Sequence, residues 1–302
     1  MIKSGQAFSV GILLAVLGAV GLAVQSLCIR YGTVKNESAH ALVVVLAVNI
    51  AFLVPVAFLL ERPLFTLTPR AMAAFTAAGL IGTMAGRAIY YEGIKRIGAS
   101  RSEPIKASQP LHASLIAVVV LAETVSVGHF LSMVCIVAGI ALISYEHGNA
   151  DVEGTDSRYA ALTLPLVAAF LYGIEPTFAK IGFAEGPDVL TGLAVKTVSA
   201  AVGFLLYLGW KTGIPRPQSF NRGEVPWLVA AGLANTVFLL GYYAALTLEP
   251  VSVVVPLVQS SPLLVIVISA LFVSDDLERI TLRLAAGAAV VVAGAVGVTL
   301  LG

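Results

Sequence analysis

The sequence predicts an all-α polytopic membrane protein whose ten transmembrane helices form two inverted five-helix repeats. Of the 302 residues, 58% are hydrophobic and only 12% are charged, whereas soluble domains carry about a quarter charged residues. The apolar runs are long enough to cross a hydrocarbon core of roughly 30 Å, which takes about 20 residues per helix. The runs are continuous rather than alternating, which excludes a membrane β-barrel.

Apolar runs of spanning length follow one another along the chain, separated by charged or turn-rich segments. We expect membrane-spanning helices near residues 8–29, 39–60, 71–93, 103–122, 127–145, 160–180, 188–209, 224–247, 250–272 and 280–301. The first run follows Lys3 and could be mistaken for a signal peptide, but the repeat described next indicates that it is retained. Ten spans place both termini on the same side of the membrane.

Matches at a constant offset of about 152 residues indicate an internal duplication. The matched pairs include Tyr90/Tyr242, Tyr91/Tyr243, Pro104/Pro256, Ser108/Ser260 and Pro110/Pro262. The polar break Glu146–Arg158 divides the chain almost in half. We therefore expect a first repeat at residues 1–147, a polar linker at 148–159 and a second repeat at 160–302.

Five helices per repeat have a geometric consequence. Because the number is odd, the second copy must enter the membrane from the opposite face, so the repeats are inverted. Such an arrangement has a pseudo-two-fold axis in the membrane plane. It places a binding site near mid-depth where the halves meet, as in many transporters that work by alternating access.

The two copies share a motif that resembles a known family. In the first copy "PIKASQPL" is followed by Glu123 and Gly139, and in the second "PLVQSSPL" is followed by Glu278 and Gly294. With these residues the chain resembles the drug/metabolite transporter (DMT) superfamily, of the ten-helix EamA type. The resemblance implies export or import of small metabolites, usually without ATP. The second copy departs from the pattern by about three extra residues near Asp275, where the spacing favours Glu278 as the family's glutamate.

A charged side chain at mid-bilayer costs about 2.5–3.5 kcal/mol and needs a partner or a water-filled cavity. Lys196 lies about a third of the way into the seventh span, and its repeat counterpart is the polar Asn49. We expect both to face the inside of the bundle, with Lys196 contacting an anionic group of the substrate or pairing with Glu175. A purely structural ion pair is the alternative.

Glu175 lies late in the sixth span, directly before Pro176, and Gln25 occupies the matching place in the first. A desolvated carboxylate there could bind a proton or a cationic substrate, because desolvation favours the protonated form. The alternative is a carboxylate already wetted at the membrane interface. Proton coupling is therefore left open.

The third and eighth spans add further candidates for the cavity wall. Arg87 and Tyr91 are four residues apart and share a helix face, after the small-residue stretch "GTMAG" that allows close helix approach. In the eighth span Tyr243 is the counterpart of Tyr91, Leu239 stands opposite Arg87, and Asn235 lies one turn earlier. Tyrosines also form belts at membrane interfaces, so lipid anchoring is the alternative for the tyrosine pairs.

Prolines mark the fourth and ninth spans as bent helices. A proline inside a helix frees a backbone carbonyl, which membranes tolerate where the freed group faces protein or water. We expect a hinge or gate at Pro104, Pro110, Pro256 and Pro262. Gln109, Gln259 and Ser260 put hydrogen-bonding side chains beside these bends and are predicted to bind substrate; simple packing kinks are the alternative.

Lys and Arg are distributed unevenly between the two sides. Twelve fall in connections 1–2, 3–4, 5–6, 7–8 and 9–10: Arg30, Lys35, Lys95, Arg96, Arg101, Lys106, Arg158, Lys211, Arg216, Arg222, Arg279 and Arg283. Four fall on the other side: Lys3, Arg62, Arg70 and Lys180. The positive-inside rule therefore predicts a multi-pass protein of the cell membrane with both termini extracytoplasmic.

These observations favour a secondary transporter, an exporter of a small organic metabolite such as an amino acid, that works by alternating access around a central cavity. A membrane channel or a non-transporting scaffold is the alternative. The chain lacks a Walker A sequence, and an intramembrane enzyme would need converging catalytic groups that the motifs do not supply. We therefore predict no catalytic residues, metal or cofactor. The predicted partners are the substrate and the lipid bilayer, without nucleic acid, and a homodimer is left open.

Overall fold

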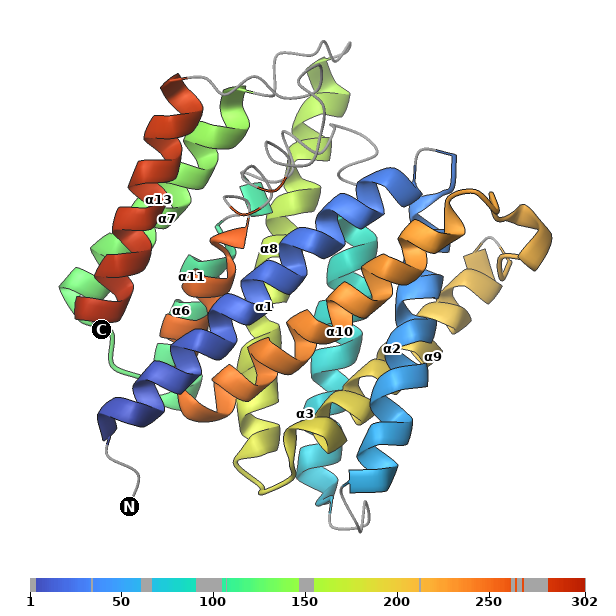
Figure 1. Ribbon diagram of the computed structural model, residues 1–302, viewed down its shortest axis with the longest axis horizontal. Helices are drawn as coiled ribbons and strands as arrows, with labels where there is room; N and C mark the ends of the chain where they lie inside the picture. Colours follow the sequence, from blue (N-terminus) through green and yellow to red (C-terminus); the bar gives the residue numbers. More distant parts are fainter. Residues whose placement is uncertain are drawn as a thin grey trace. The chain divides into compact units, whose positions relative to one another are not determined.

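A computed structural model describes residues 4–33, 35–60, 67–90, 105–106, 108–146, 155–211, 213–261, 264, 268 and 282–301. These residues are helical or lie in turns and connections, with no β-strand among them. The longer helices are α1 (Ser4–Gly32), α2 (Ser38–Leu60), α7 (Val127–Glu146), α8 (Thr155–Phe183), α9 (Val189–Lys211), α10 (Val225–Leu248) and α13 (Leu282–Leu301). The shorter ones are α3 (Pro69–Ala78), η2 (Gly79–Gly86), α6 (Gln109–Leu121), η3 (Pro217–Ser219) and α11 (Val251–Val258) (Figure 1).

Six helices in the described ranges are long and apolar enough to cross a membrane. They are Val10–Ile29, Ser38–Leu60, Pro69–Tyr90, Thr163–Phe183, Val189–Lys211 and Val225–Leu248. Each lies within a few residues of a span expected from the sequence. The all-helical membrane class is thus confirmed, while the count of ten spans stays a prediction.

Two predicted spans are less regular than the sequence suggests. The ninth, near 250–272, contains α11, which ends at Val258 and gives way to a turn at Gln259 and Ser260. The third contains α3, the π-helix η2 and a last turn up to Tyr90. Residues 91–93 of that span lie outside the described residues.

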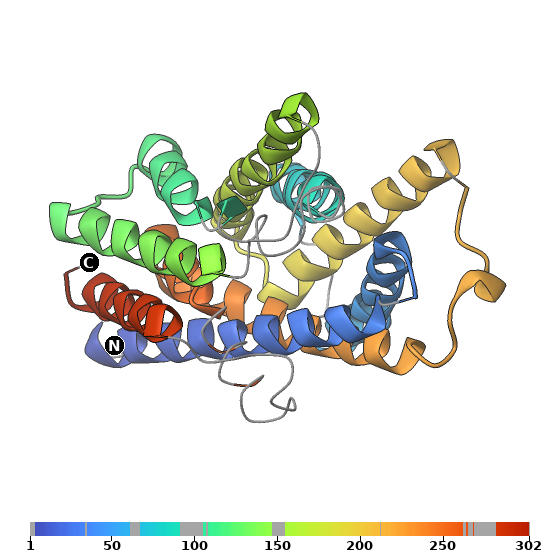
Figure 2. The same cartoon turned by 90° about the horizontal axis from the view of Figure 1, so that it is seen from above.

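The chain forms two compact units, and each draws on both halves of the sequence. Unit 1 consists of Met1–Met84 and Phe178–Leu248, and unit 2 of Ala85–Thr177 and Glu249–Gly302. In unit 1, α1 and α10 pack along their length (Figures 1 and 2). A Cβ on Gly21 would lie 2.7 Å from the backbone nitrogen of Phe238, so glycine permits this close approach.

The motif glycines of the two repeats serve the same purpose in unit 2. There α7 and α13 lie side by side, green and red in both views. A Cβ on Gly139 of α7 would lie 2.8 Å from the carbonyl oxygen of Gly287, and one on Gly294 of α13 would lie 2.7 Å from that of Ser132. The glycines that mark the repeat in sequence therefore set the distance between these two helices.

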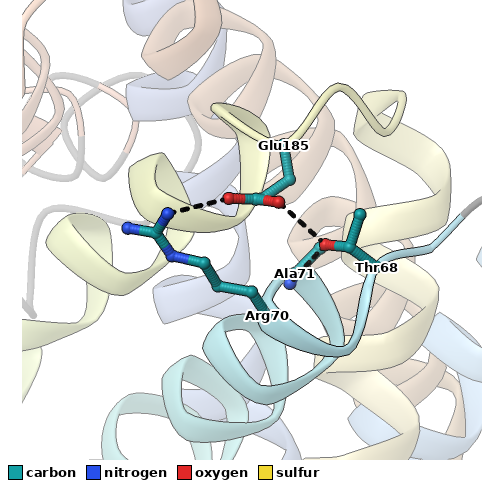
Figure 3. A network of polar contacts seen from close by, with 4 residues as sticks. All are labelled: Thr68, Arg70, Ala71 and Glu185. Atoms are coloured by element: carbon teal, nitrogen blue, oxygen red, sulfur yellow. Dashed lines mark hydrogen bonds and ion pairs between the residues drawn. The ribbon is translucent and has the colours of Figure 1, made fainter.

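The start of α3 is fixed by a small polar network in unit 1 (Figure 3). Thr68 caps the helix by accepting a hydrogen bond from the backbone nitrogen of Ala71 at 3.1 Å, and it donates to Glu185 at 3.0 Å. Arg70 completes the network with an ion pair to Glu185 at 3.1 Å. Because the Arg70 side chain is 74% exposed, we expect the cap to contribute more stability than the ion pair.

Candidate functional site

The lysine predicted inside the membrane is buried in unit 1. Lys196 belongs to α9 and is only 2% exposed. Its Nζ lies over the ring of Tyr243, 4.4 Å from the ring centroid. A cation over an aromatic face is stabilised by about 2 kcal/mol or more when both groups are desolvated. The fold thus brings together two of the predicted binding residues, one from α9 and one from α10.

The backbone at Lys196 is held by α3 and η2. Gly79, the first residue of η2, is so close to α9 that a Cβ added there would lie 2.3 Å from the carbonyl oxygen of Lys196. One turn earlier Thr76 hydrogen-bonds to Ser199 at 3.2 Å between the two hydroxyl oxygens. The close packing at Gly79 therefore fixes where the lysine leaves its helix.

Other aromatic rings pack against Tyr243 in unit 1. Phe183 lies edge-on to Tyr243 with ring centroids 5.9 Å apart, and Phe75 lies edge-on to Phe183 at 5.0 Å. Tyr242 contacts Tyr243 at 5.3 Å. Edge-to-face packing of this kind fixes ring orientation, so the ring beneath Lys196 is held in place. The sequence did not single out Phe75 or Phe183, since phenylalanine is unremarkable in a membrane helix.

Three predicted polar residues join in one hydrogen-bonded amide network, also in unit 1. The Asn235 side chain donates to Gln25 at 2.8 Å and accepts from Asn49 at 2.7 Å, and Thr236 donates to Asn49 at 3.1 Å. With the Asn49 amide turned over, its nitrogen would instead donate to the Gly232 carbonyl at 3.0 Å. Amide orientation is assigned from such networks rather than observed. In both orientations the network links α1, α2 and α10.

The hydrogen-bond partners separate the unit 1 candidates into two groups. Gln25, Asn49 and Asn235 are at most 6% exposed and bond to one another, as expected of polar residues that hold membrane helices together. Lys196 instead carries a charge whose burial is expensive. Its role as a binding residue stays a prediction, and so do those of the three amides.

Unit 2 contains the glutamine pair and the predicted acid. Gln259, in the turn after α11, donates a short hydrogen bond to Gln109 in the first turn of α6. Gln109 in turn donates to the carbonyl oxygen of Tyr172 on α8 at 3.3 Å. Glu175, one turn further along α8, is 9% exposed. The structure therefore joins the fourth and ninth predicted spans through their glutamines.

The motif glutamate of the first repeat caps a helix of unit 2. Glu123 accepts hydrogen bonds from the backbone nitrogens of Val251 and Ser252 at 3.0 and 3.2 Å and from the Ser252 hydroxyl at 3.1 Å. A carboxylate is favourable at a helix N-terminus, which carries partial positive charge. The buried ring of His129 hydrogen-bonds to the carbonyl of Ser252 at 2.7 Å. Glu123 thus fixes where α11 begins.

Two polar residues of the predicted third span have buried atoms: Thr83 lies in the π-helix η2, and Arg87 follows directly after it. Thr83 is 5% exposed. In the described part of the chain, its Oγ1 and the Nη1 of Arg87 are buried without a hydrogen-bond partner. Most buried polar groups in proteins have a partner, so each exception needs an explanation.

The comparison with family models decides what kind of protein carries this arrangement. The model of the EamA-like transporter family matches residues 9–145 and, a second time, residues 159–300. The chain belongs to the EamA-like transporter family. The resemblance to the DMT superfamily seen in the sequence is thereby confirmed. None of the curated proteins matched significantly.

Solved structures share the fold of this EamA-like chain. One of them, titled only "Crystal structure of protein", matches over 97% of each chain with a TM-score of 0.76 and 14% sequence identity. At that identity the likeness shows the fold alone. The family identifies a membrane transporter rather than an enzyme, and the described residues contain no group of three or more His, Cys, Asp or Glu that could hold a metal ion.

The predicted hinge residues of the EamA-like chain are only partly described. Pro110 occupies the first turn of α6, where a proline is tolerated because its missing N–H has no intrahelical partner. The interruption lies just before it, at Ser108. Pro256 lies inside α11, two residues before the helix ends. Pro104, Pro262 and Tyr91 lie outside the described residues, and Ser260 donates to the local carbonyl of Leu257.

Proposed function

We propose that this protein is a secondary transporter that exports a small organic metabolite, such as an amino acid, by alternating access. Membership of the EamA-like transporter family supports the transport class, and the sequence resemblance supports movement of a small metabolite, by export or import, without ATP. The repeated match of the family model supports two like halves. Their inverted orientation follows from an odd number of helices per half, and such halves are the usual basis of alternating access.

The observation that carries the proposal is the buried lysine of α9. Lys196 is eight residues into a 23-residue apolar helix and is 2% exposed. A membrane protein retains such a charge, at about 2.5–3.5 kcal/mol, where it serves a substrate or ion pathway. We therefore assign Lys196 and Tyr243 as substrate contacts, with the amides of Gln25, Asn49 and Asn235 as the scaffold beside them.

Two finer features complete the proposal. Glu175, buried before Pro176 in α8, is the acid that we assign to proton coupling, because a buried carboxylate can exchange a proton during the cycle. Lys and Arg are in excess in the connections between predicted spans 1 and 2, 3 and 4, 5 and 6, 7 and 8, and 9 and 10. By the positive-inside rule this excess supports a cytoplasmic location for these connections and extracytoplasmic termini in the cell membrane. Uptake driven by an imposed proton gradient, lost in Glu175→Gln, tests the coupling.

The substrate contact is tested with a pair of lysines on one helix. Lys211 ends α9 and lies over the ring of Trp210 at 5.9 Å, but Trp210 is 81% exposed. Detergent-purified protein is screened by thermal shift against amino acids, nucleosides, sugar phosphates and organic cations, and hits are measured for uptake into proteoliposomes. A ligand that binds only the folded state raises its apparent stability.

We expect Lys196→Met to weaken binding of the hit about tenfold or more, as loss of a charge-assisted hydrogen bond does. Lys211→Met, the matched control, is expected to bind and transport like the wild type. Equal binding by both variants would remove Lys196 from the site. No binding and no uptake by folded wild-type protein would contradict transport and favour a scaffold.

A further inference from the structure

In unit 1 the connection between α1 and α2 is bonded to the connection between α9 and α10. The carboxylate of Glu224, directly before α10, accepts hydrogen bonds from the backbone nitrogens of Lys35 and Asn36 at 3.0 and 3.2 Å. It also accepts one from the Asn36 side chain at 3.0 Å. We call the described residues of these two connections, 33, 35–37 and 213–224, the platform.

A further hydrogen bond across the platform brings two basic residues together. The buried side chain of Asn36 accepts from the backbone nitrogen of Asn221 at 2.9 Å. Lys35 directly precedes Asn36, and Arg222 directly follows Asn221. The bond therefore holds the backbone of the two basic residues close together, and both of their side chains are exposed.

His40, near the start of α2, holds the part of the platform that contains a third basic residue. Its Nε2 hydrogen-bonds to the Oγ of Ser219 at 2.8 Å, and its ring lies edge-on to that of Phe220 with centroids 4.5 Å apart. The Ser219 hydroxyl donates to the carbonyl oxygen of Arg216 at 2.7 Å. The Arg216 side chain is exposed as well, so three basic residues belong to the same fixed surface.

The platform presents more positive than negative charge. Its basic residues Lys35, Arg216 and Arg222 are all exposed. Its acidic residues are Glu37, which is exposed, and Glu224. Both carboxylate oxygens of Glu224 accept backbone hydrogen bonds, so this negative charge is directed into the platform rather than outward.

An aromatic pair beside the platform indicates its depth in the membrane. Tyr31 in the last turn of α1 and Trp227 in the first turn of α10 pack with ring centroids 5.0 Å apart. These two helices lie side by side (Figure 1), and Trp227 is 46% exposed. Tyr and Trp at the ends of membrane helices lie at the level of the lipid headgroups. The platform adjoins both helix ends and therefore lies at that level.

We propose that the platform binds the phosphate group of an anionic phospholipid. Lys and Arg at a membrane surface are attracted to anionic headgroups, and Arg can also form paired hydrogen bonds with phosphate. At the other end of unit 1 the exposed Arg70 is instead paired with Glu185 at 3.1 Å. The lipid contact is separate from the transported metabolite and goes beyond the proposed function.

The two tryptophans of the chain allow a direct test. Trp210→Phe leaves Trp227 as the single fluorescent reporter beside the platform. This protein is reconstituted into phosphatidylcholine vesicles that contain, at equal mole fraction, brominated phosphatidylglycerol or brominated phosphatidylcholine, because brominated acyl chains quench tryptophan fluorescence on contact. The platform variant replaces Lys35, Arg216 and Arg222 by Gln, and Arg70→Gln is the matched control at the other end of unit 1.

We expect brominated phosphatidylglycerol to quench Trp227 more strongly than brominated phosphatidylcholine. Each basic residue near the surface changes the affinity for anionic lipid about fivefold. The platform variant should therefore bind phosphatidylglycerol about tenfold more weakly or worse, whereas Arg70→Gln should bind it like the parent. The platform uses only backbone atoms of Lys35 and Arg216 for its hydrogen bonds, so the thermal midpoint in detergent should be unchanged.

Equal quenching by the two brominated lipids in the parent protein would overturn the proposal. So would a phosphatidylglycerol preference that persists in the folded platform variant. If the triple variant does not fold, Lys35→Gln and Arg222→Gln decide singly, each with an expected loss of about fivefold. Glycerol 1-phosphate has the phosphate without acyl chains. If it abolishes the preference at millimolar concentration, the platform binds a soluble phosphate and the lipid assignment is wrong.

Discussion

The third and eighth helices of the repeat scheme, Pro69–Tyr90 and α10, have the same place in the two halves but different structures. The third passes from α-helix to π-helix at Gly79, whereas α10 is α-helical over its 24 residues. At matching positions the third has Thr83, and α10 has Asn235, whose amide bonds to α1 and α2. In the described part of the chain, the third helix has a buried Thr83 hydroxyl without a hydrogen-bond partner, whereas Asn235 of α10 bonds to neighbouring helices.

This difference shows that polar residues at matching positions of the two repeats can have different roles. Polar residues whose hydrogen bonds are all made within the bundle stabilise helix contacts. Buried polar atoms without partners lower stability, so each one needs an explanation other than helix packing. We name α10 the scaffold copy, since its Asn235 amide bonds to α1 and α2, whereas Thr83 of the third helix makes no such bond in the described part of the chain.

The largest expected effect comes from making the third helix more like its counterpart at Gly79. The matching residue of α10 is Ala231, yet a methyl group at position 79 would lie 2.3 Å from the carbonyl oxygen of Lys196. We expect Gly79→Ala to destabilise the protein by about 3 kcal/mol, because overpacking against backbone forces the helices apart. Unfolding in detergent, followed by circular dichroism, measures the loss.

A glycine of the same helix pair provides the control. A Cβ on Gly203 of α9 would meet only the ends of the flexible Leu80 and Met84 side chains. Gly203→Ala should therefore cost much less than Gly79→Ala, and it should leave any ligand response that depends on the proposed Lys196 contact unchanged. Equal losses in the two variants would show that the contact at Gly79 is not specific.

The second effect concerns the scaffold copy itself. Asn235→Leu removes the central amide of the network and leaves the Gln25 and Asn49 side chains buried without their partner. We expect a loss of about 2 kcal/mol, since each group left unsatisfied costs about 1–3 kcal/mol and membrane bundles partly compensate. Thr83→Val, the change at the matching position of the third helix, should not lower stability. A neutral Asn235→Leu would break the comparison.

Much of the fold could be predicted because hydrophobic length is a direct consequence of the bilayer. Spans such as 39–60 and 188–209 correspond to α2 and α9 within two residues. The repeat was visible because motif residues recur at a fixed offset, and Gly139 and Gly294 recur for a packing reason. The π-helix was not visible, since a glycine-rich stretch such as "GTMAG" fits an α-helical contact equally well.

The candidate site could be predicted only in part. Burial of Lys196 follows from its place in an apolar run, but its contact with Tyr243 depends on how α9 and α10 pack. The sequence likewise identified Gln25, Asn49 and Asn235 as polar residues in the membrane without showing that they bond to one another. Pairing between distant helices is a property of the fold, and composition or spacing does not encode it directly.

The smallest expected effect tests whether the residues of the amide network contribute unequally to stability. The Thr236 hydroxyl lies within hydrogen-bond distance of both the Asn49 amide at 3.1 Å and the Gly232 carbonyl of its own helix at 3.0 Å. Thr236→Val removes one shared donor at the edge of the network, so we expect a loss of about 0.6 kcal/mol, the average for hydrogen bonds between membrane helices.

Thr236→Ser should restore that stability, because serine keeps the hydroxyl and removes only a methyl group. The three proteins are compared by unfolding in one detergent at one pH. A loss in Thr236→Val as large as that in Asn235→Leu would mean that the Asn49 amide depends on this hydroxyl as much as on Asn235. The amide network of the scaffold copy would then be cooperative, so that loss of any one hydrogen bond destabilises the whole network. The alternative is a strong central amide with weaker hydrogen bonds around it.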